Sequence, residues 1–234
     1  MIALNERLAS PLPAEGDFDF DDADPSSIIE WAVETVGRSR LVVATSFGPS
    51  GMVNLHMLAG IAPEVPVVFV DTLYHFEETL ELANVVSEKY GLDVRIYRPA
   101  ESRQEFERLH GERLWERDLD RFHELTKVEP MERALEGVAG WITGRRRDQS
   151  RTRSDMPHVE IGDRIKVNPL ASWTRKDVWT YLTKHDVPYN ALHDRGYTSI
   201  GDEPLTTPTL AGEDERAGRW RGQDRLECGL HTLI

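Results

Sequence analysis

The sequence is short of cysteine, with one, Cys228, in 234 residues. A single thiol excludes an intramolecular disulfide. It also excludes an iron–sulfur cluster or zinc finger held only by cysteines of one chain, because each needs several thiolates. The eight histidines form no HExxH-like pair. The sequence therefore gives no support for a metal site.

Long hydrophobic runs and an excess of basic residues are also missing. No apolar stretch approaches the ~20 residues that span a bilayer, and the first residues lack the pattern of a signal peptide. The chain carries 41 acidic and 28 basic residues, a formal net charge of −13, which does not favour a broad nucleic-acid surface. We expect a cytoplasmic protein that binds neither membrane nor nucleic acid, with any anion site confined to a local cluster.

Short apolar segments alternate with stretches of helical periodicity from residue 41 onward. The apolar segments are LVVA, PVVFV, LDVRIYR, WIT and RIKVNPL. Helices are predicted from Pro25 (capped by Asp24), from about residue 51, over about 76–90 and over 174–186. This alternation predicts an α/β fold, a mostly parallel sheet with helices on both faces.

Composition divides the chain into three parts. Residues 1–23 are rich in Pro, Gly and Asp and are predicted to form a poorly ordered acidic arm. Residues 24–200 have a length that suits one nucleotide-binding α/β domain. Residues 201–234 mix Gly, Pro, Thr and charge with little periodicity, so we expect a mobile C-terminal tail that carries Cys228.

The turn TSFGPSG, residues 45–51, directly follows the first predicted strand and precedes a helix. In an open parallel sheet such a turn lies where ligands bind, and the helix N-terminus offers unpaired N–H groups to an anion. Ser46, Phe47 and Gly48 are therefore candidates for phosphate or sulfate binding. An ordinary strand–helix turn explains the same pattern, and the GK[ST] of a Walker A loop is absent.

Five arginines follow the strand WIT within GRRRDQSRTR, in an otherwise acidic chain. They are Arg145, Arg146, Arg147, Arg151 and Arg153. Guanidinium groups bind phosphate oxygens bidentately, so the cluster is a candidate clamp for a phosphorylated ligand. A solvated charged surface is the alternative, and the position directly after a strand favours binding.

Four other residues have two interpretations each. Asp71 closes the strand PVVFV and is either a nucleotide contact or a helix N-cap. Lys127, Lys166 and Trp173 are compatible with lining a site and equally with structural roles.

The only cysteine lies in the polar stretch GQDRLECGLH. A lone cysteine is more often a small buried hydrophobe than a nucleophile, but its polar neighbours argue against burial in the core. Nucleophilic attack requires the thiolate. Glu227 beside Cys228 disfavours the thiolate, whereas His231 or a nearby arginine cluster favours it, and the sequence leaves open which effect prevails.

Several motifs, taken in order, resemble the phosphoadenylyl-sulfate/adenylyl-sulfate reductase family: SFG, WERDLDRFHELTKVEPMERAL, GRRRDQS, KVNPL and ECGLH. The resemblance spans about residues 26–231 and implies an adenine-nucleotide α-hydrolase-like sheet. It implies that the SFG loop and the arginines of GRRRDQS bind the sulfate and phosphate end of the nucleotide. Cys228 would be the nucleophile, and Asp71, Lys166 and His231 complete the predicted site.

The chain departs from the family members that hold a [4Fe–4S] cluster. Those members carry a CC pair before the KVEP-like segment and a CxxC after the GYxSIG-like segment. Here the places read Phe122 and His123, and then residues 202–205. We therefore expect no cluster and no other bound cofactor. Cluster loss in the family largely accompanies use of the 3′-phosphorylated nucleotide, and SFGPSG lacks the SGGxDS pattern of ATP pyrophosphatases.

The implied reaction is reduction of 3′-phosphoadenylyl sulfate to sulfite and adenosine 3′,5′-bisphosphate through an S-sulfocysteine on Cys228. Sulfite release needs a second thiol, and the chain has none. The resemblance implies reduced thioredoxin, or glutaredoxin, as the donor and a homodimer as the assembly. The alternatives are a cluster-free adenylyl-sulfate reductase, an ATP pyrophosphatase or nucleotidyltransferase on the same fold, and a non-catalytic nucleotide- or thioredoxin-binding protein.

Overall fold

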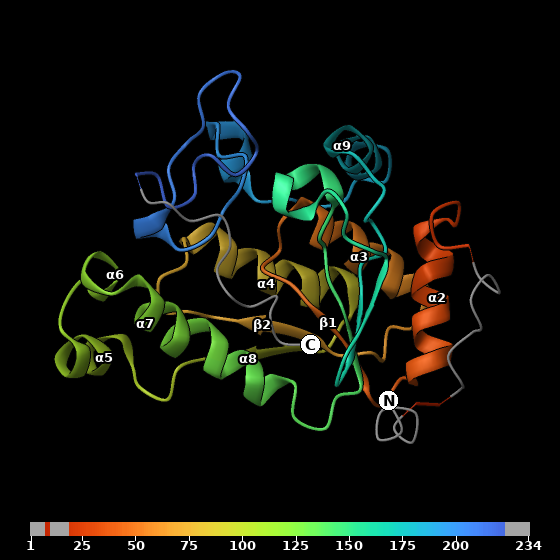
Figure 1. The fold of residues 1–234 in the computed structure, drawn as a ribbon, viewed down its shortest axis with the longest axis horizontal. Coiled ribbons are helices and arrows are strands. Elements are labelled where there is room, and N and C mark those ends of the chain that lie inside the picture. The colour runs from red at the N-terminus through yellow and green to blue at the C-terminus, as the bar shows by residue number, and fades with distance from the viewer. Residues whose placement is uncertain (1–7, 10–18, 223–234) are drawn as a thin grey trace.

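A six-stranded sheet forms the centre of the protein, in a computed structural model that describes residues 8–9 and 19–222 (Figure 1). The strands are β1 (Leu41–Ala44), β2 (Val67–Val70), β3 (Val94–Tyr97), β4 (Gly140–Ile142), β5 (Val159–Ile161) and β6 (Ile165–Val167). Their order is β3-β2-β1-β4-β6-β5, and every neighbouring pair is parallel except β5 with β6. The predicted Cys228 and His231 lie outside the described residues.

The direction of winding reverses between β1 and β4. From β1 the chain moves outward through β2 to β3, and it then returns to place β4 on the other side of β1. The two strands are in parallel register, with Val43 opposite Ile142, so the loops that follow them leave the sheet side by side. Open α/β sheets bind ligands at such a switch point, at the carboxyl ends of the strands.

Helices cover both faces of the sheet, which confirms the predicted fold class. The helices are α2 (Pro25–Val36), α3 (Pro49–Ile61), α4 (Glu77–Tyr90), α5 (Arg103–His110), α6 (Leu114–Arg117), α7 (Leu119–His123), α8 (Glu129–Ala134) and α9 (Arg175–Lys184). A π-helical turn, η1 (Glu124–Val128), joins α7 to α8. Within the described residues, no helix has the length and apolar character needed to cross a membrane.

Alternation along the strands explains the two layers. Leu41 and Val43 point into the larger core, which the apolar sides of α2, α3, α4 and α9 complete, whereas Val42 points to the opposite face. There Val42 packs with Trp141 and with residues of α8, including Met131. Successive side chains of a strand face opposite sides, so a strand buried on both faces is apolar throughout.

The helix boundaries follow the predicted capping signals closely. Asp24 accepts a hydrogen bond from the Ser26 N–H, with Pro25 as the first helical residue. Thr174 and Asp177 form a capping box at the start of α9. Helix α4 ends at Gly91, which adopts a left-handed conformation with φ of 64°. Helix α3 begins at Pro49, two residues earlier than predicted.

Strand β5 has no counterpart in the sequence prediction. It is only three residues long and contains Glu160, so its apolar pattern is weak. It forms as the antiparallel edge of the sheet because the chain turns back at Gly162 and pairs residue 159 with residue 167.

The described part of the C-terminal segment, residues 201–222, packs beside the sheet. Leu205 and Trp220 join Tyr74, Phe106, Leu114 and Phe122 in a third apolar cluster. The Glu203 N–H donates to the Tyr74 carbonyl at 2.7 Å, and the Trp220 N–H donates to the Leu205 carbonyl at 2.9 Å. This segment is the blue part of Figure 1.

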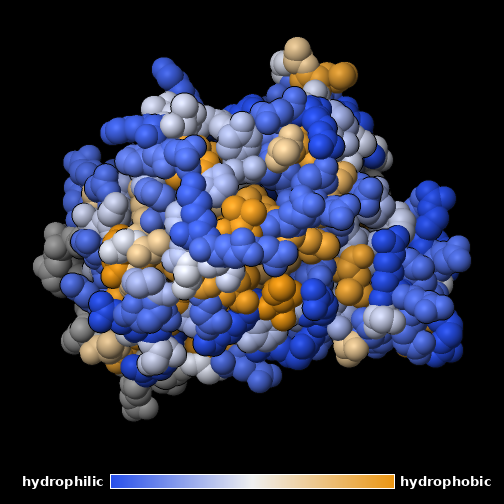
Figure 2. Space-filling model, turned by 180° about the vertical axis from the view of Figure 1, so that it is seen from behind, coloured by the Kyte–Doolittle hydropathy of each residue, from blue (hydrophilic) through white to orange (hydrophobic). Residues whose placement is uncertain are grey.

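Figure 2 shows that hydrophilic residues cover most of the opposite face of the molecule, in keeping with the high charge content.

Candidate active site

A cavity lies at the carboxyl edge of the sheet, at the switch point between β1 and β4. One wall is apolar and comes from the strands and α8, including Val68, Val70, Met131 and Trp141. The polar part of the lining comes mainly from the loops after β1 and β4 and from residues 198–201, 215, 216 and 219. Ligand pockets commonly combine an apolar wall with a few converging polar groups.

The loop after β1 brings the start of α3 to the cavity. Ser46 and Gly48 line it, and Gly48 is the N-cap of α3 without any side-chain cap. Thr45 Oγ1 accepts from the Phe47 N–H at 2.9 Å, and Phe47 has a φ of 56° that turns its ring into the core, 4.9 Å from Phe69. Phe47 is thus a buried support of the loop, while the start of α3 supplies N–H groups of the kind that bind anions.

The backbone at the start of α3 lies very close to the backbone of the loop after β4, which carries the arginines. A Cβ on Gly144 would lie 2.8 Å from the Gly51 nitrogen, and a Cβ on Gly51 would collide with Thr45 Oγ1. Both glycines are therefore required where the β1 and β4 loops meet, and this is a packing reason for the two glycines of the motifs.

The five predicted arginines do not act as one unit. Arg145, Arg146 and Arg153 line the cavity, whereas Arg147 turns away and donates to the Met156 carbonyl at 2.8 Å. Arg147 also pairs with Asp21 at 2.8 Å, and Arg151 is exposed. The contacts of Arg147 with Met156 and Asp21 hold it away from the cavity, and the sequence cluster alone does not reveal this split.

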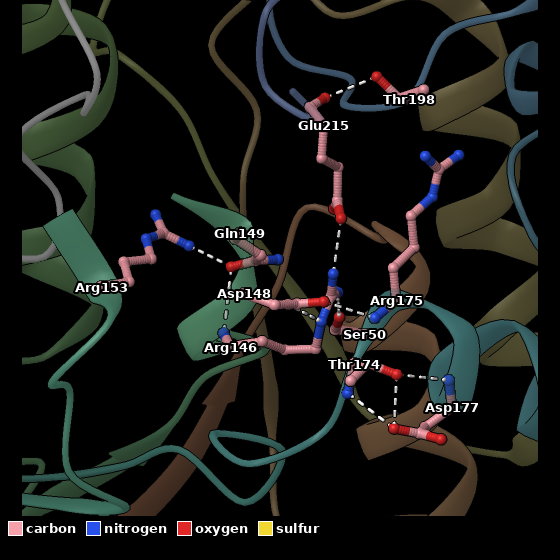
Figure 3. A network of polar contacts seen from close by, with 10 residues as sticks. All are labelled: Ser50, Arg146, Asp148, Gln149, Arg153, Thr174, Arg175, Asp177, Thr198 and Glu215. Atoms are coloured by element: carbon pink, nitrogen blue, oxygen red, sulfur yellow. Dashed lines mark hydrogen bonds and ion pairs between the residues drawn. The ribbon is translucent and has the colours of Figure 1, made fainter. Parts of the chain in front are cut away.

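Arg146 is the buried centre of a polar network (Figure 3). Its side chain is about 2% exposed, its Nε donates to Asp148 Oδ1 at 2.9 Å, and one of its amino groups donates to Ser50 Oγ. The other amino group donates to Glu215 Oε2 at 2.6 Å. Asp148 Oδ2 in turn accepts from the Arg175 N–H at the start of α9. Arg146 therefore links α3, α9 and the C-terminal segment around the cavity.

The C-terminal segment adds two arginines that the sequence prediction missed. Arg216 and Arg219 line the cavity, and their guanidinium carbons lie 5.4 Å and 4.6 Å from the centre of the Trp220 ring. Cation–π contacts of this kind orient a guanidinium group. The signal that could have found them is the run of four arginines, at positions 216, 219, 221 and 225, before the only cysteine.

Lys127 and Asp202 form a buried ion pair at the edge of the cavity. Lys127 lines the cavity from η1, and its Nζ lies 2.5 Å from Asp202 Oδ2. Asp202 is fully buried and also accepts from Thr72 Oγ1 at 2.7 Å. Burial raises the pKa of Asp202, but Lys127, His123 and His75 together outweigh it and hold the pKa of this carboxyl well below its usual range. Burial lowers the pKa of His75, which also lines the cavity.

Asp71 stands beside the cavity, between the lining residues Val70 and Thr72. Its Oδ2 accepts from Arg98 Nε at 2.7 Å, and its Oδ1 accepts from the Leu73 N–H at 3.0 Å. The second bond shapes the turn after β2. Asp71 is not the N-cap that was the alternative to nucleotide contact, because α4 begins at Glu77 with Phe76 as its N-cap.

Lys166 and Trp173 lie away from the cavity lining. Lys166 is fully buried on β6, with its Nζ 5.2 Å from the centre of the Trp141 ring and 3.7 Å from Glu160 Oε2. Burial lowers the pKa of Lys166 to about 8. Trp173 packs against the larger core beside Tyr181. These positions favour structural roles.

The four places where cluster-bearing family members have cysteines come together in space. Phe122 and Leu205 share the third apolar cluster, and His123 Nε2 lies 3.8 Å from Asp202 Oδ2. None of the four side chains carries a thiol, and the carboxylate among them is paired with Lys127. These residues do not fit an iron–sulfur cluster. Among the described residues, no group of three or more histidine or acidic side chains is placed to hold a metal ion.

Comparison with known proteins agrees with this site. A model of the family "Phosphoadenosine phosphosulfate reductase domain" matches residues 40–208, well over half of the chain. An adenosine 5′-phosphosulfate reductase of Halalkalibacterium halodurans is 42% identical over 212 residues, covering 89% of this chain and 91% of the relative. A phosphoadenosine phosphosulfate reductase of Emericella nidulans is 41% identical over 220 residues, covering 89% of this chain and 71% of the relative.

Solved structures give the same result. The crystal structure of phosphoadenylyl-sulfate reductase from Candida auris, a phosphate complex, has a TM-score of 0.73 and 37% identity, covering 85% of this chain and all of that one. An FMN adenylyltransferase of Candida glabrata, at 15% identity and a TM-score of 0.62, shares the fold alone. With the family model, the relatives and the cavity in agreement, the chain belongs to the adenylyl-sulfate and phosphoadenylyl-sulfate reductase family of sulfur-group oxidoreductases in sulfate assimilation.

Proposed function

We propose that the protein reduces 3′-phosphoadenylyl sulfate to sulfite and adenosine 3′,5′-bisphosphate, with Cys228 as nucleophile and a thioredoxin-type dithiol as electron donor. The observation that carries the proposal is the concentration of positive charge in the cavity of an acidic protein. Within residues 19–222, six cationic side chains line it: Lys127, Arg145, Arg146, Arg153, Arg216 and Arg219. Such a set suits a ligand with several phosphate and sulfate oxygens.

The two walls of the cavity suit the two ends of an adenine nucleotide. The apolar wall of Val68, Val70, Met131 and Trp141 offers a surface for a base, and the start of α3 and the arginines offer donors for oxyanions. The phosphate complex of the Candida auris enzyme supports an anion site in this fold.

In the first step the Cys228 thiolate attacks the sulfonyl sulfur of the nucleotide. A sulfur–sulfur bond forms, the bond from sulfur to the bridging phosphate oxygen breaks, and its electron pair leaves with adenosine 3′,5′-bisphosphate. The charge that develops on the phosphate oxygens is the charge that Arg146, Arg216 and Arg219 are placed to stabilise.

In the second step a donor thiolate attacks the Cys228 sulfur. Sulfite leaves with the electron pair of the sulfur–sulfur bond, and a mixed disulfide forms. A second thiol of the donor then releases Cys228 and leaves the donor oxidised. Because the chain has one cysteine, both donor thiols must come from another protein, which is why we propose thioredoxin or glutaredoxin as partner. We further propose that the enzyme works as a homodimer without a bound cofactor.

Adenylyl sulfate is the second candidate substrate. The observation in its favour is that the relative from Halalkalibacterium halodurans and one from Bacillus subtilis, both 42% identical, are named adenosine 5′-phosphosulfate reductases. The relatives from Emericella nidulans and Candida auris are named for the 3′-phosphorylated substrate.

Sulfite release tests the proposal. With reduced thioredoxin, we expect a larger kcat/KM for phosphoadenylyl sulfate than for adenylyl sulfate. We expect the variant Cys228→Ser to release no sulfite and still to bind nucleotide. A larger kcat/KM with adenylyl sulfate would select the second candidate, and sulfite release by Cys228→Ser would overturn the proposed mechanism.

A further inference from the structure

Glu215 is the one acidic residue that lines the cavity within the described part of the chain. Other carboxylates pair with the cavity's cations from behind: Asp148 with Arg146, Glu160 with Arg145, and Asp202 with Lys127. None of these three lines the cavity. Glu215 therefore occupies the side of Arg146 from which a ligand would approach.

The contact between Glu215 and Arg146 occupies one N–H of the guanidinium group on the cavity side. Arg146 Nε donates to Asp148, one amino group donates to Ser50 and the second amino group donates to Glu215 at 2.6 Å, so each amino group keeps one further N–H. Figure 3 shows the Glu215 side chain reaching down to the second amino group from the C-terminal segment. A carboxylate there holds the place that a sulfate or phosphate oxygen would take.

The backbone of Glu215 has a separate anchor. Thr198 Oγ1 donates to the Glu215 carbonyl at 2.6 Å, and this bond does not involve the carboxylate. The Glu215 side chain is 15% exposed and lines the cavity, so it borders open space on that side. The carboxylate can therefore leave Arg146 by rotation of its side chain while the backbone of the segment keeps its position.

We propose that the Glu215 carboxylate competes with the substrate for Arg146. It binds Arg146 while the site is empty, and an oxyanion of the substrate must displace it. Asp148 and Glu215 already share the single positive charge of Arg146, so a ligand anion that bound while Glu215 stayed in place would be repelled. Glu215 compensates the buried Arg146 charge while the site is empty and lowers the affinity of the site for anions. The inference rests on the proposed function only for the identity of the anion.

The matched variants are Glu215→Gln and Glu213→Gln. Both remove one negative charge from the same segment, but Glu213 pairs with Arg221 at 2.7 Å and does not line the cavity. Glutamine at position 215 keeps the size of the side chain and a neutral acceptor for Arg146. Isothermal titration calorimetry at constant ionic strength would measure the Kd of each variant and of the unchanged protein for inorganic sulfate and for adenosine 5′-monophosphate.

We expect Glu215→Gln to bind sulfate on the order of tenfold more tightly than the unchanged protein, because one like charge is removed from the subsite, and Glu213→Gln to bind as before. An unchanged or weaker sulfate affinity in Glu215→Gln would overturn the proposal, as would an equal gain in Glu213→Gln. If sulfate binding tightens in Glu215→Gln while no variant binds the nucleotide, Glu215 is a competitor but the proposed function fails. If all three proteins bind the nucleotide and all three bind sulfate with equal affinity, the competition by Glu215 is excluded and the proposed function is not.

Discussion

Lys127 Nζ and Asp202 Oδ2 lie 2.5 Å apart, both side chains are buried, and 75 positions of sequence separate them. The pair joins the π-helical turn before α8 to the first residues of the C-terminal segment. It lies where two cysteine-bearing motifs of cluster-containing family members would meet. The ion pair therefore connects the cavity wall to the segment that carries Arg216 and Arg219.

Asp202→Asn is expected to destabilise the protein by about 3–5 kcal/mol, because it leaves the buried Lys127 charge without a counter-ion. Urea unfolding at pH 7 measures this loss. The double variant Lys127→Met/Asp202→Asn removes both charges and should recover much of it. A single variant as stable as the unchanged protein would show that the pair contributes nothing.

The same ion pair makes the stability of the fold depend on pH. The pKa of Asp202 is held below its unfolded value of about 4, so the folded state binds its proton less readily than the unfolded state. The pair therefore stabilises the fold above about pH 4, and this contribution is lost as the pH falls from there through the lowered pKa. The stability difference between the unchanged protein and Asp202→Asn should shrink over this acid range, as measured by urea unfolding at several pH values.

Arg146→Ala and Arg147→Ala are expected to differ strongly, although the residues are adjacent. Removing Arg146 takes away a guanidinium group that lines the cavity. The loss of one charge-assisted hydrogen bond costs about 1.5–3 kcal/mol of binding free energy, so we expect the nucleotide affinity to fall roughly tenfold to a hundredfold. Arg147 faces Met156 and Asp21, so its removal should leave the affinity within about twofold of the starting value. Calorimetry with adenosine 5′-monophosphate measures both, and circular dichroism checks that each variant is folded. Equal losses would contradict the division of the arginine cluster.

Lys166→Met tests whether the buried lysine has a structural or a binding role. Its pKa of about 8 in the fold lies below 10.5, so the unfolded state binds its proton more readily between these values, and stability rises with pH over that window. The methionine variant should lack this rise, which amounts to roughly 3 kcal/mol, and should keep its nucleotide affinity. The exposed Lys176, replaced by Met in the same way, is the control. Loss of nucleotide binding in Lys166→Met would restore the predicted binding role.

The sequence allowed the sheet and the location of the cavity to be predicted because both depend on local patterns. The apolar runs of β1, β2 and β4 are buried on both faces, and the loops after β1 and β4 carry the two glycine-containing motifs. Caps such as Asp24 and Thr174 set helix starts through contacts with near neighbours. These features need no knowledge of distant contacts.

The rest of the site depends on tertiary contacts that no local pattern encodes. Arg145 and Arg146 face the cavity while Arg147 does not, because the directions of side chains in the loop after β4 depend on Asp148 and Met156. Lys127, Arg216 and Arg219 reach the cavity through pairing and packing with Asp202 and Trp220. Asp71 is occupied by Arg98, a partner that its own strand does not predict.

The most direct test of the reductase mechanism is intact-protein mass spectrometry of the reduced enzyme with phosphoadenylyl sulfate and, in parallel, with adenylyl sulfate, without thioredoxin. Attack by Cys228 predicts a sulfonate adduct that maps to this residue and disappears when thioredoxin is added. We expect the adduct with the 3′-phosphorylated nucleotide, and comparable adducts with both would support adenylyl sulfate as a second substrate. Nucleotide binding without any adduct at Cys228 would contradict the mechanism.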